Sequence, residues 1–191
     1  MEAAIRNQLS RIIPLSDKEW NAFKAITLYE KVPNKELIKR SAYIGRRSFF
    51  VIKGAFRLFY IDDSANEITT HFFLEPNFIT NCESFLSRIQ ENLHIEAIEE
   101  SELLVFGNDA LTDLYELYPN LKQIETFVIK SILNETVHHN FLLQLKTPEE
   151  QYKTLLSQNP ALINRVSVTH LSSYLGMARE TLSRVRSKQL L

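Results

Sequence analysis

The chain has 191 residues, of which 45% are hydrophobic and 24% are charged, a composition typical of a folded protein. Its single cysteine excludes, within this sequence, a disulfide, a four-cysteine zinc site and a cysteine-held iron–sulfur cluster. No apolar run approaches the ~18 residues that cross a bilayer, and charged residues interrupt the apolar N-terminal segment. We therefore expect a cytoplasmic protein with no membrane span and no signal peptide.

The charge is unevenly distributed along the chain, although the net value is only −1. Residues 165–191 carry five basic side chains and one acidic side chain, so this segment has a charge of +4 and the remainder a charge of −5. A basic end on an acidic body favours contact with a polyanion such as DNA. A solvated surface helix is the alternative that charge alone leaves open.

The first thirty residues have the periodicity of helices. Leu9, Ile12 and Ile13 recur at helical spacing. Ser16 followed three residues later by Glu19 is the pattern of a capping box, which would open a second helix. That second helix would carry Trp20, Phe23 and Ile26.

Short aromatic and branched segments then predict strands as far as Phe106. The first two meet at Lys53-Gly54, where glycine permits a tight turn, and a polar hairpin tip follows at 62–66. Short strands with frequent turns predict an antiparallel, jelly-roll-like β-roll, and we interpret its aromatic residues as core rather than as a cofactor site. The expected strands are residues 48–53, 55–61, 68–74, 93–98 and 102–106.

The chain becomes helical again from Asn108. Asn108 or Asp109 is expected to cap a helix through Leu117, and Pro119 suits the first turn of a long helix that runs to about Leu145. A helix of this length usually buries its apolar stripe against its own body or against a second subunit, and we predict a homodimer contact along 119–145. The stripe repeats every three to four positions, at Leu121, Ile124, Val128 and Ile132, widened by Phe127 and Leu133.

Thr147 and Pro148 interrupt the helical pattern and mark a domain boundary. Thr147 could cap a helix over 149–156, which Asn159-Pro160 would end. We predict an α+β fold in three parts: a sensor β-roll with flanking helices (1–118), a long dimerisation helix and hinge (119–146), and a helical DNA-binding domain (147–191).

Residues 166–185 have the pattern of a helix-turn-helix unit. Ser167 is a good N-cap, and Gly176 supplies the tight turn between two short helices. One face is apolar, formed by Val168, Leu171, Leu175, Leu182 and Val185. The opposite side of the second helix would carry Arg179, Glu180, Ser183 and Arg184.

Side chains of these types can read the edges of bases. An arginine can donate two hydrogen bonds to O6 and N7 of guanine, and a carboxylate can accept one from N4 of cytosine. The alternative is an ion pair within the helix between Glu180 and Arg184, which would contribute only about 0.2–0.5 kcal/mol, and both can hold. We expect salt-dependent phosphate contacts from Arg165, Arg186 and Lys188.

The segment Leu175–Arg184 resembles the recognition region of the Crp/Fnr family of bacterial transcription regulators, whose pattern is G-x-[S]-R-E-T-x-x-R. Ser48–Leu58 resembles early strands of the family's β-roll, and Phe106–Pro119 resembles the segment that leads into its dimerisation helix. The resemblance implies a cyclic-nucleotide-binding-like sensor domain. It also implies base reading by Arg179, Glu180 and Arg184, and contacts to the DNA backbone from Ser167 and Thr181.

Two departures from the family pattern affect the expected ligand and the expected DNA contacts. Where members that bind cyclic AMP have G-D-x-x-G-E and R-[S/T]-A, this chain reads 76–81 as PNFITN and 91–93 as ENL. Glu91 would repel the phosphate by about 4 kcal/mol at ~4 Å and an effective dielectric constant of ~20. Residues 187–191 are too short for the usual β-hairpin wing, so backbone contacts are fewer or the helix runs on.

We therefore predict no conventional binding of cyclic AMP, and no cofactor or metal, and the sequence does not name an effector. Adjacent His138 and His139 would point about 100° apart on a helix, so they could not chelate one metal together. A sensor pocket for another ligand would draw on Asn77, Thr80, Asn81 and Arg88.

The predicted function is that of a sequence-specific DNA-binding transcriptional regulator. It would act as a homodimer on a palindromic operator, with RNA polymerase as a further partner and no enzymatic activity, because the sequence offers no nucleophile–base pair. The alternative is a signalling module that binds a cyclic nucleotide or another small ligand and carries a degenerate DNA-binding unit.

Overall fold

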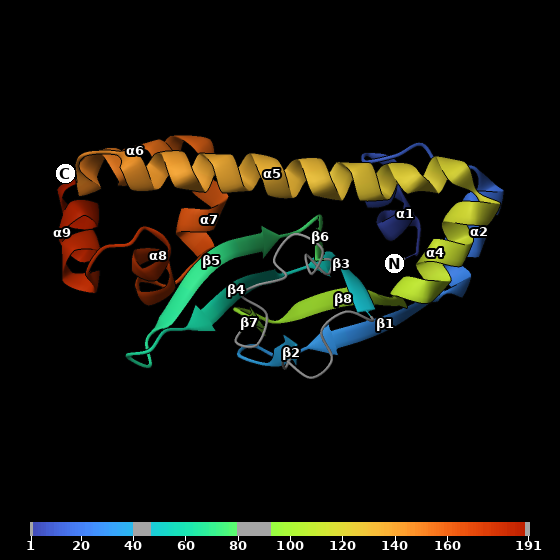
Figure 1. Ribbon diagram of the computed structural model, residues 1–191, viewed down its shortest axis with the longest axis horizontal. Helices are drawn as coiled ribbons and strands as arrows, with labels where there is room; N and C mark the ends of the chain where they lie inside the picture. Colours follow the sequence, from blue (N-terminus) through green and yellow to red (C-terminus); the bar gives the residue numbers. More distant parts are fainter. Residues whose placement is uncertain (1, 40–46, 80–92, 190–191) are drawn as a thin grey trace. The chain divides into compact units, whose positions relative to one another are not determined.

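The computed structural model describes residues 2–39, 47–79 and 93–189 (Figure 1). The strands form two four-stranded antiparallel sheets, with the orders β1-β8-β3-β6 and β2-β7-β4-β5. This arrangement confirms the predicted antiparallel roll. The strands are β1 (Thr27–Val32), β2 (Leu37–Lys39), β3 (Arg47–Lys53), β4 (Ala55–Ile61), β5 (Glu67–Leu74), β6 (Asn77–Ile79), β7 (Leu93–Ala97) and β8 (Ser101–Gly107).

Helices precede and follow the sheets along the chain. None of the described helices combines the length and the apolar character needed to cross a membrane. The helices are α1 (Glu2–Ser10), α2 (Asp17–Ala25), α4 (Asn108–Leu117), the 3-10 helix η3 (Pro119–Lys122), α5 (Gln123–Gln144), α6 (Pro148–Gln158), α7 (Pro160–Arg165), α8 (Val168–Tyr174) and α9 (Arg179–Gln189).

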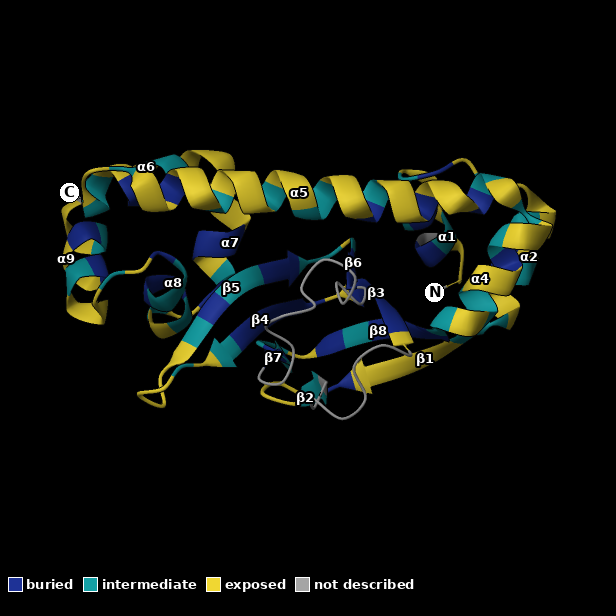
Figure 2. Ribbon diagram, viewed as in Figure 1, coloured by how far each residue is buried: buried dark blue, intermediate teal, exposed yellow. Residues whose placement is uncertain are grey.

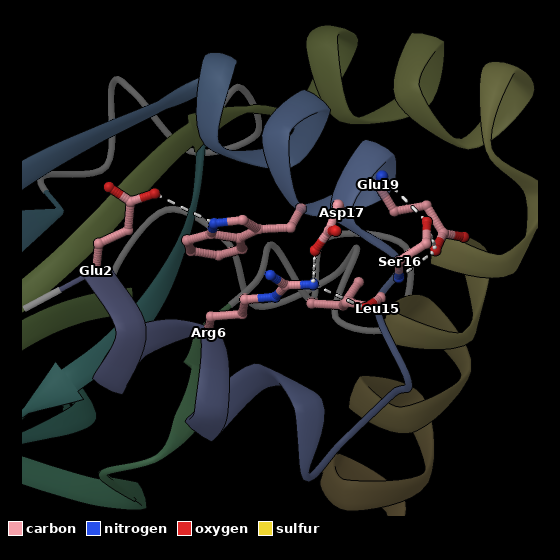
Figure 3. Close-up of polar contacts among 7 residues, drawn as sticks. Glu2, Arg6, Leu15, Ser16, Asp17 and Glu19 are labelled. Carbon is pink, nitrogen blue, oxygen red and sulfur yellow. Dashed lines mark hydrogen bonds and ion pairs between the residues drawn. The ribbon is translucent and has the colours of Figure 1, made fainter.

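Local hydrogen bonds explain where α2 begins. The Ser16 hydroxyl accepts from the backbone N–H of Glu19 at 3.3 Å, and the Glu19 carboxylate accepts from the Ser16 N–H at 2.8 Å (Figure 3), which confirms the predicted capping box. Arg6 of α1 reaches the same corner, with its Nη2 2.6 Å from the Asp17 carboxylate and donating to the Leu15 carbonyl. These contacts fix α1 against the start of α2.

Aromatic side chains from several strands form the core of the roll, as predicted. Phe50 and Phe56 are fully buried. The Phe78 ring lies with its centroid 4.7 Å from that of Phe50 and 6.3 Å from that of Phe106, and Phe23 of α2 reaches the same Phe106 ring at 5.6 Å. The aromatic residues therefore contact one another and act as core.

A buried ion pair crosses this otherwise apolar region. Arg57 Nε donates to the Glu96 carboxylate at 2.6 Å, and the Arg57 side chain is only 3% exposed. Nearby, Gly54 has φ +100, and a Cβ there would lie 2.7 Å from the Cα of Ser101. The predicted Lys53-Gly54 turn is confirmed, and both its conformation and its surroundings require glycine.

The structure corrects the sequence prediction at four places. Residues 27–30, which the helical periodicity of the first thirty residues includes, belong to β1, whose residues are exposed except at its ends and so show no alternating apolar pattern. The short strand β6 is not among the strands that the sequence predicts. Helix α4 has Gly107 at its N-cap, not Asn108, because the Asn108 side chain accepts from the Ser48 hydroxyl. Helix α7 was not predicted.

The long helix confirms the predicted span, after a 3-10 turn that begins at Pro119. Thr147 caps α6, as predicted, and forms a capping box with Glu150. The chain divides into two compact units, Met1–Arg57 with Phe73–Ser131, and Leu58–Phe72 with Ile132–Leu191. The second unit thus combines the tip of the β4–β5 hairpin with the C-terminal helices.

Candidate nucleic-acid interface

Helices α8 and α9 form the helix-turn-helix unit that the sequence predicts. Ser167 caps α8 by accepting from the His170 N–H at 3.1 Å. Gly176 has φ +63, a left-handed conformation that glycine adopts without steric cost, and the Met177 N–H donates to the Ser172 carbonyl to close the helix end. The chain therefore turns sharply into α9.

The inward face of this unit is mainly apolar, with Ser172 as a buried polar residue. Leu171 and Leu182 have no exposed surface, and Leu175 and Val185 are each 1% exposed. Val168, which the sequence placed on this face, is only half-buried, and Val166 is buried in addition. Helix α9 packs against α6 and α8, so its orientation is fixed by this core.

The outward face of α9 carries the predicted base-reading residues. Arg179, Glu180, Ser183 and Arg184 are all exposed. Figure 2 shows both exposed and buried segments along α9. Glu180 and Arg184, both in the described part of the chain, form no ion pair, so the intrahelical pair that the sequence left open is not formed here. Two guanidinium groups and one carboxylate thus lie in solvent on one short helix.

The predicted backbone-contacting residues come from the end of α7, the start of α8 and α9 itself. Arg186 and Thr181 of α9 are half-buried, and Lys188 is exposed with its Nζ 3.8 Å from a Glu149 carboxylate oxygen. Arg165 is half-buried at the end of α7, and the Ser167 hydroxyl is already engaged as the α8 cap. The basic residues Arg186 and Lys188 in the last turn of α9 also favour its dipole.

The sequence alone missed the residue that holds the end of α8. Ser173 donates from its hydroxyl to the Glu67 carbonyl at 2.8 Å and accepts from the Thr69 N–H at 2.9 Å, so it bridges the backbone of strand β5. The partners are more than a hundred residues apart, and no local spacing could have indicated the contact. Ser173 is a positioning residue for the helix-turn-helix unit.

Tyr174, next along the chain, is held between two rings. The His139 ring stacks on it with centroids 3.9 Å apart and planes 7° apart, and the Phe72 ring lies at 5.2 Å. His139 Nε2 also donates to the Tyr174 carbonyl at 2.7 Å. Burial lowers the pKa of His139 and raises that of the Tyr174 hydroxyl, so both rings are favoured in their neutral forms.

Helix α5, with the preceding η3, has two apolar stripes, one buried and one exposed. Leu121 of η3 and Ile124 and Val128 of α5 are buried against the chain's own body. A second stripe, which we call the outer stripe, follows at spacings of four residues and is exposed by 39–62%: Ile129, Leu133, Val137 and Phe141. A contiguous exposed apolar stripe of this kind is a feature of association surfaces.

Of the four predicted sensor-pocket residues, Asn77 lies among the described residues. Asn77 is half-buried in β6, where its side-chain oxygen accepts from the Phe78 N–H. Thr80, Asn81 and Arg88 lie outside the described residues, as do Glu91 and Cys82. Among the described residues no cluster of three or more potential metal ligands occurs.

Comparison with solved structures shows a shared fold. The c-di-GMP-responsive global regulator CLP of Xanthomonas campestris aligns with a TM-score of 0.71 at 18% identity, over 92% of each chain. A cyclic nucleotide-binding domain containing protein of Listeria monocytogenes aligns with a TM-score of 0.71 at 16% identity, over 98% of this chain and 90% of that one.

A third structure comes from Eubacterium rectale and is assigned to the Crp/Fnr family of transcriptional regulators. It aligns with a TM-score of 0.66 at 13% identity, over 92% of this chain and 84% of that one. No protein-family model and no curated protein sequence matches the chain. The chain therefore has the fold of Crp/Fnr regulators, from the roll through the C-terminal helices.

Proposed function

We propose that this chain is a Crp/Fnr-type transcriptional regulator that binds double-stranded DNA sequence-specifically as a homodimer. One observation carries the proposal: Arg179, Glu180 and Arg184 are exposed on a helix whose opposite face is sealed into a helix-turn-helix core. Such a helix can enter the major groove with a fixed orientation. The shared fold supports the same reading.

The exposed groups match the chemistry of base recognition. The guanidinium fork of Arg179 or Arg184 fits the O6 and N7 acceptors of guanine, and the Glu180 carboxylate fits the N4 donor of cytosine. Thr181, Ser167 and the basic residues Arg165, Arg186 and Lys188 would contact the backbone, which supplies affinity without sequence information. We also propose the division into a sensor roll (1–118), a dimerisation helix with hinge (119–146) and a DNA-binding domain (147–191).

The outer stripe of α5 supports the homodimer. Ile129, Leu133, Val137 and Phe141 expose apolar surface along most of the helix in the single chain. In a two-fold dimer, the outer stripe of one copy would pack against the outer stripe of the other copy. Two recognition helices related by that axis would read a palindromic operator with half-sites about 34 Å apart. RNA polymerase is the further partner that such a regulator would meet.

The dimer predicts a specific disruption. Leu133→Asp places a carboxylate in the outer stripe of both copies, where the two charges would repel and lose hydration. We expect the variant to sediment as a monomer where the unaltered chain sediments as a dimer. Asn21→Asp, which adds the same charge at an exposed position of α2, is the matched control and should remain dimeric. A dimeric Leu133→Asp variant would place the interface elsewhere.

The function is tested by selecting bound sequences from a pool of random duplexes with the full chain. The proposal predicts recovery of a palindromic site whose half-sites are separated by about one helical turn. Recovery of sequences with no common element would contradict it. Retention of duplexes that disappears at moderate salt for every sequence alike would show backbone contact only.

A further inference from the structure

The second unit contains a cavity that the proposed function does not use. Its volume is about 380 Å³, within the range of roughly 300–1,000 Å³ typical of small-molecule sites. Strand β5 contributes His71 and Phe72, α5 contributes Glu135 and His138, and α8 contributes Tyr174. We call this space the β5–α5 cavity. Of the four sensor-pocket candidates from the sequence, the one described residue, Asn77, does not line it.

The fixed charge in the lining of the β5–α5 cavity is negative. Among the described lining residues Glu135 is the one carboxylate, and none is lysine or arginine. His71 Nε2 lies 3.9 Å from the Glu135 carboxylate, but burial and the neighbouring His139 lower the pKa of His71 to about 4, so this ring is neutral at neutral pH. An anion in this space would face a carboxylate without a fixed cation from the lining.

Aromatic and apolar surface completes the lining. The rings of Phe72 and Tyr174 lie 5.2 Å apart, and both contribute aromatic surface to the lining. Leu142, Leu155 and Leu162 add aliphatic surface. Asn134, Gln158 and Asn159 add amide groups. A carboxylate also has several acceptor positions and can bind a further donor beside those it already has.

We propose that the β5–α5 cavity is a binding site for a small organic cation, in which Glu135 accepts from the ammonium group and Phe72, Tyr174 and the leucines contact the apolar body. The chemistry of the lining distinguishes this ligand class from the cyclic nucleotides, whose phosphate is negative. Its two aromatic rings and three leucines suit a ligand with an apolar or aromatic body.

The position of the cavity gives binding a consequence for DNA recognition, and this part rests on the proposed function. Tyr174 ends α8 and Leu162 belongs to α7, whereas Glu135 and His138 belong to α5. A ligand that touches both groups of residues ties the helix-turn-helix unit to α5. Such a ligand changes the affinity for DNA if its own affinity for the cavity differs between the DNA-bound and the DNA-free arrangement of the protein.

Calorimetric titration of the full chain without DNA tests the binding. The probes are tryptammonium, tryptophol and indole-3-acetate, which share an indole ring on a short chain and differ in charge. We expect tryptammonium to bind at least about tenfold more tightly than indole-3-acetate, with the neutral alcohol between them, since a charge-assisted hydrogen bond is roughly twice as strong as a neutral one. Equal affinities, the reverse order or no heat from any probe at millimolar concentration would overturn the proposal.

Glu135→Gln removes the charge at a side chain that is 39% exposed, while it keeps the size of the side chain and one acceptor oxygen. We expect this variant to lose about tenfold in tryptammonium affinity while tryptophol affinity stays unchanged. Glu125→Gln, on the same helix and outside the cavity, is the matched control. Unchanged tryptammonium binding by Glu135→Gln would place the cation elsewhere.

The regulatory part has its own readout. Tryptammonium should shift the affinity of the unaltered chain for its selected duplex, and the shift should be lost in Glu135→Gln. If tryptammonium binds without any change in the affinity for DNA, the coupling to DNA recognition is wrong, but the binding site still stands. Because the calorimetry uses no DNA, failure to select a duplex would count against the proposed function and not against the cavity.

Discussion

Arg57 and Arg179 are both arginines, but one is buried in the β-roll and the other is exposed on the C-terminal unit. Arg57 lies in the β-roll, is 2% exposed and pairs with Glu96 at 2.6 Å. Arg179 opens α9 and is exposed, with its guanidinium in solvent. A buried charge is tolerated only when its partner is in place, whereas an exposed one is available to a ligand. Arg57 therefore serves the structure of the roll, whereas Arg179 is presented to solvent by the C-terminal unit.

The largest expected effect comes from breaking the buried pair. Arg57→Ala should lower the free energy of unfolding of the first unit by up to about 3–5 kcal/mol, because the Glu96 side chain, only 15% exposed, would lose the partner that compensates its charge. Urea denaturation followed by the fluorescence of Trp20, the single tryptophan, reports this unit.

The matched variant for that experiment is Arg179→Ala, whose free energy of unfolding should change by no more than about 0.5 kcal/mol. The double variant Arg57→Met with Glu96→Leu should recover most of the loss, since both charges are then absent. A loss from Arg57→Ala no larger than that from Arg179→Ala would mean that the two arginines do not differ in structural role.

The next largest effect is a dependence on pH in the second unit. Burial and His139 lower the pKa of His71 to about 4, and the facing carboxylate of Glu135 does not reverse this. The unfolded chain, with a pKa near 6.5, binds a proton on His71 that the folded chain does not bind until about pH 4. Stability therefore falls as the pH drops through this window, by up to about 3 kcal/mol.

Urea midpoints by far-UV circular dichroism between these pH values measure the loss. His71→Gln removes the titrating group and should flatten the part of the slope that His71 causes. An identical slope in the unaltered chain and in His71→Gln would show that His71 is accessible to protons in the folded state.

The smallest of these effects concerns the contact of α8 with β5. Ser173→Ala removes both hydrogen bonds of its hydroxyl, to Glu67 and from Thr69, at a cost of about 1–2 kcal/mol. Amide hydrogen exchange at Thr69 should accelerate by about tenfold or more. Ser187→Ala removes only a bond within α9 and should leave Thr69 unchanged. Unaltered exchange at Thr69 in Ser173→Ala would mean that Ser173 does not hold β5.

Local spacing predicted much of this molecule. Ser16, Thr147 and Ser167 each cap a helix because the side chain and its N–H partner are three residues apart, a relation visible in the sequence. The strands of the roll are likewise visible where aromatic residues alternate or run together. The exposed face of α9 follows from helical periodicity alone.

Long-range contacts were beyond such reasoning. Strand β1 exposes most of its residues and is held by backbone pairing with β8, so its side chains give no strand pattern. Ser173 and the β5–α5 cavity depend on segments about a hundred residues apart. The division of α5 into a buried and an outer stripe required knowing where the roll's core lies.

The most direct test of the central claim is the affinity of Arg179→Ala for the selected duplex and for variants of it at each base pair, with Arg11→Ala as an exposed-arginine control. If Arg179 reads a base, the variant should lose about 1–3 kcal/mol on the selected site and become indifferent at one base pair per half-site. A uniform loss on all duplexes, or no loss at all, would contradict base reading by α9.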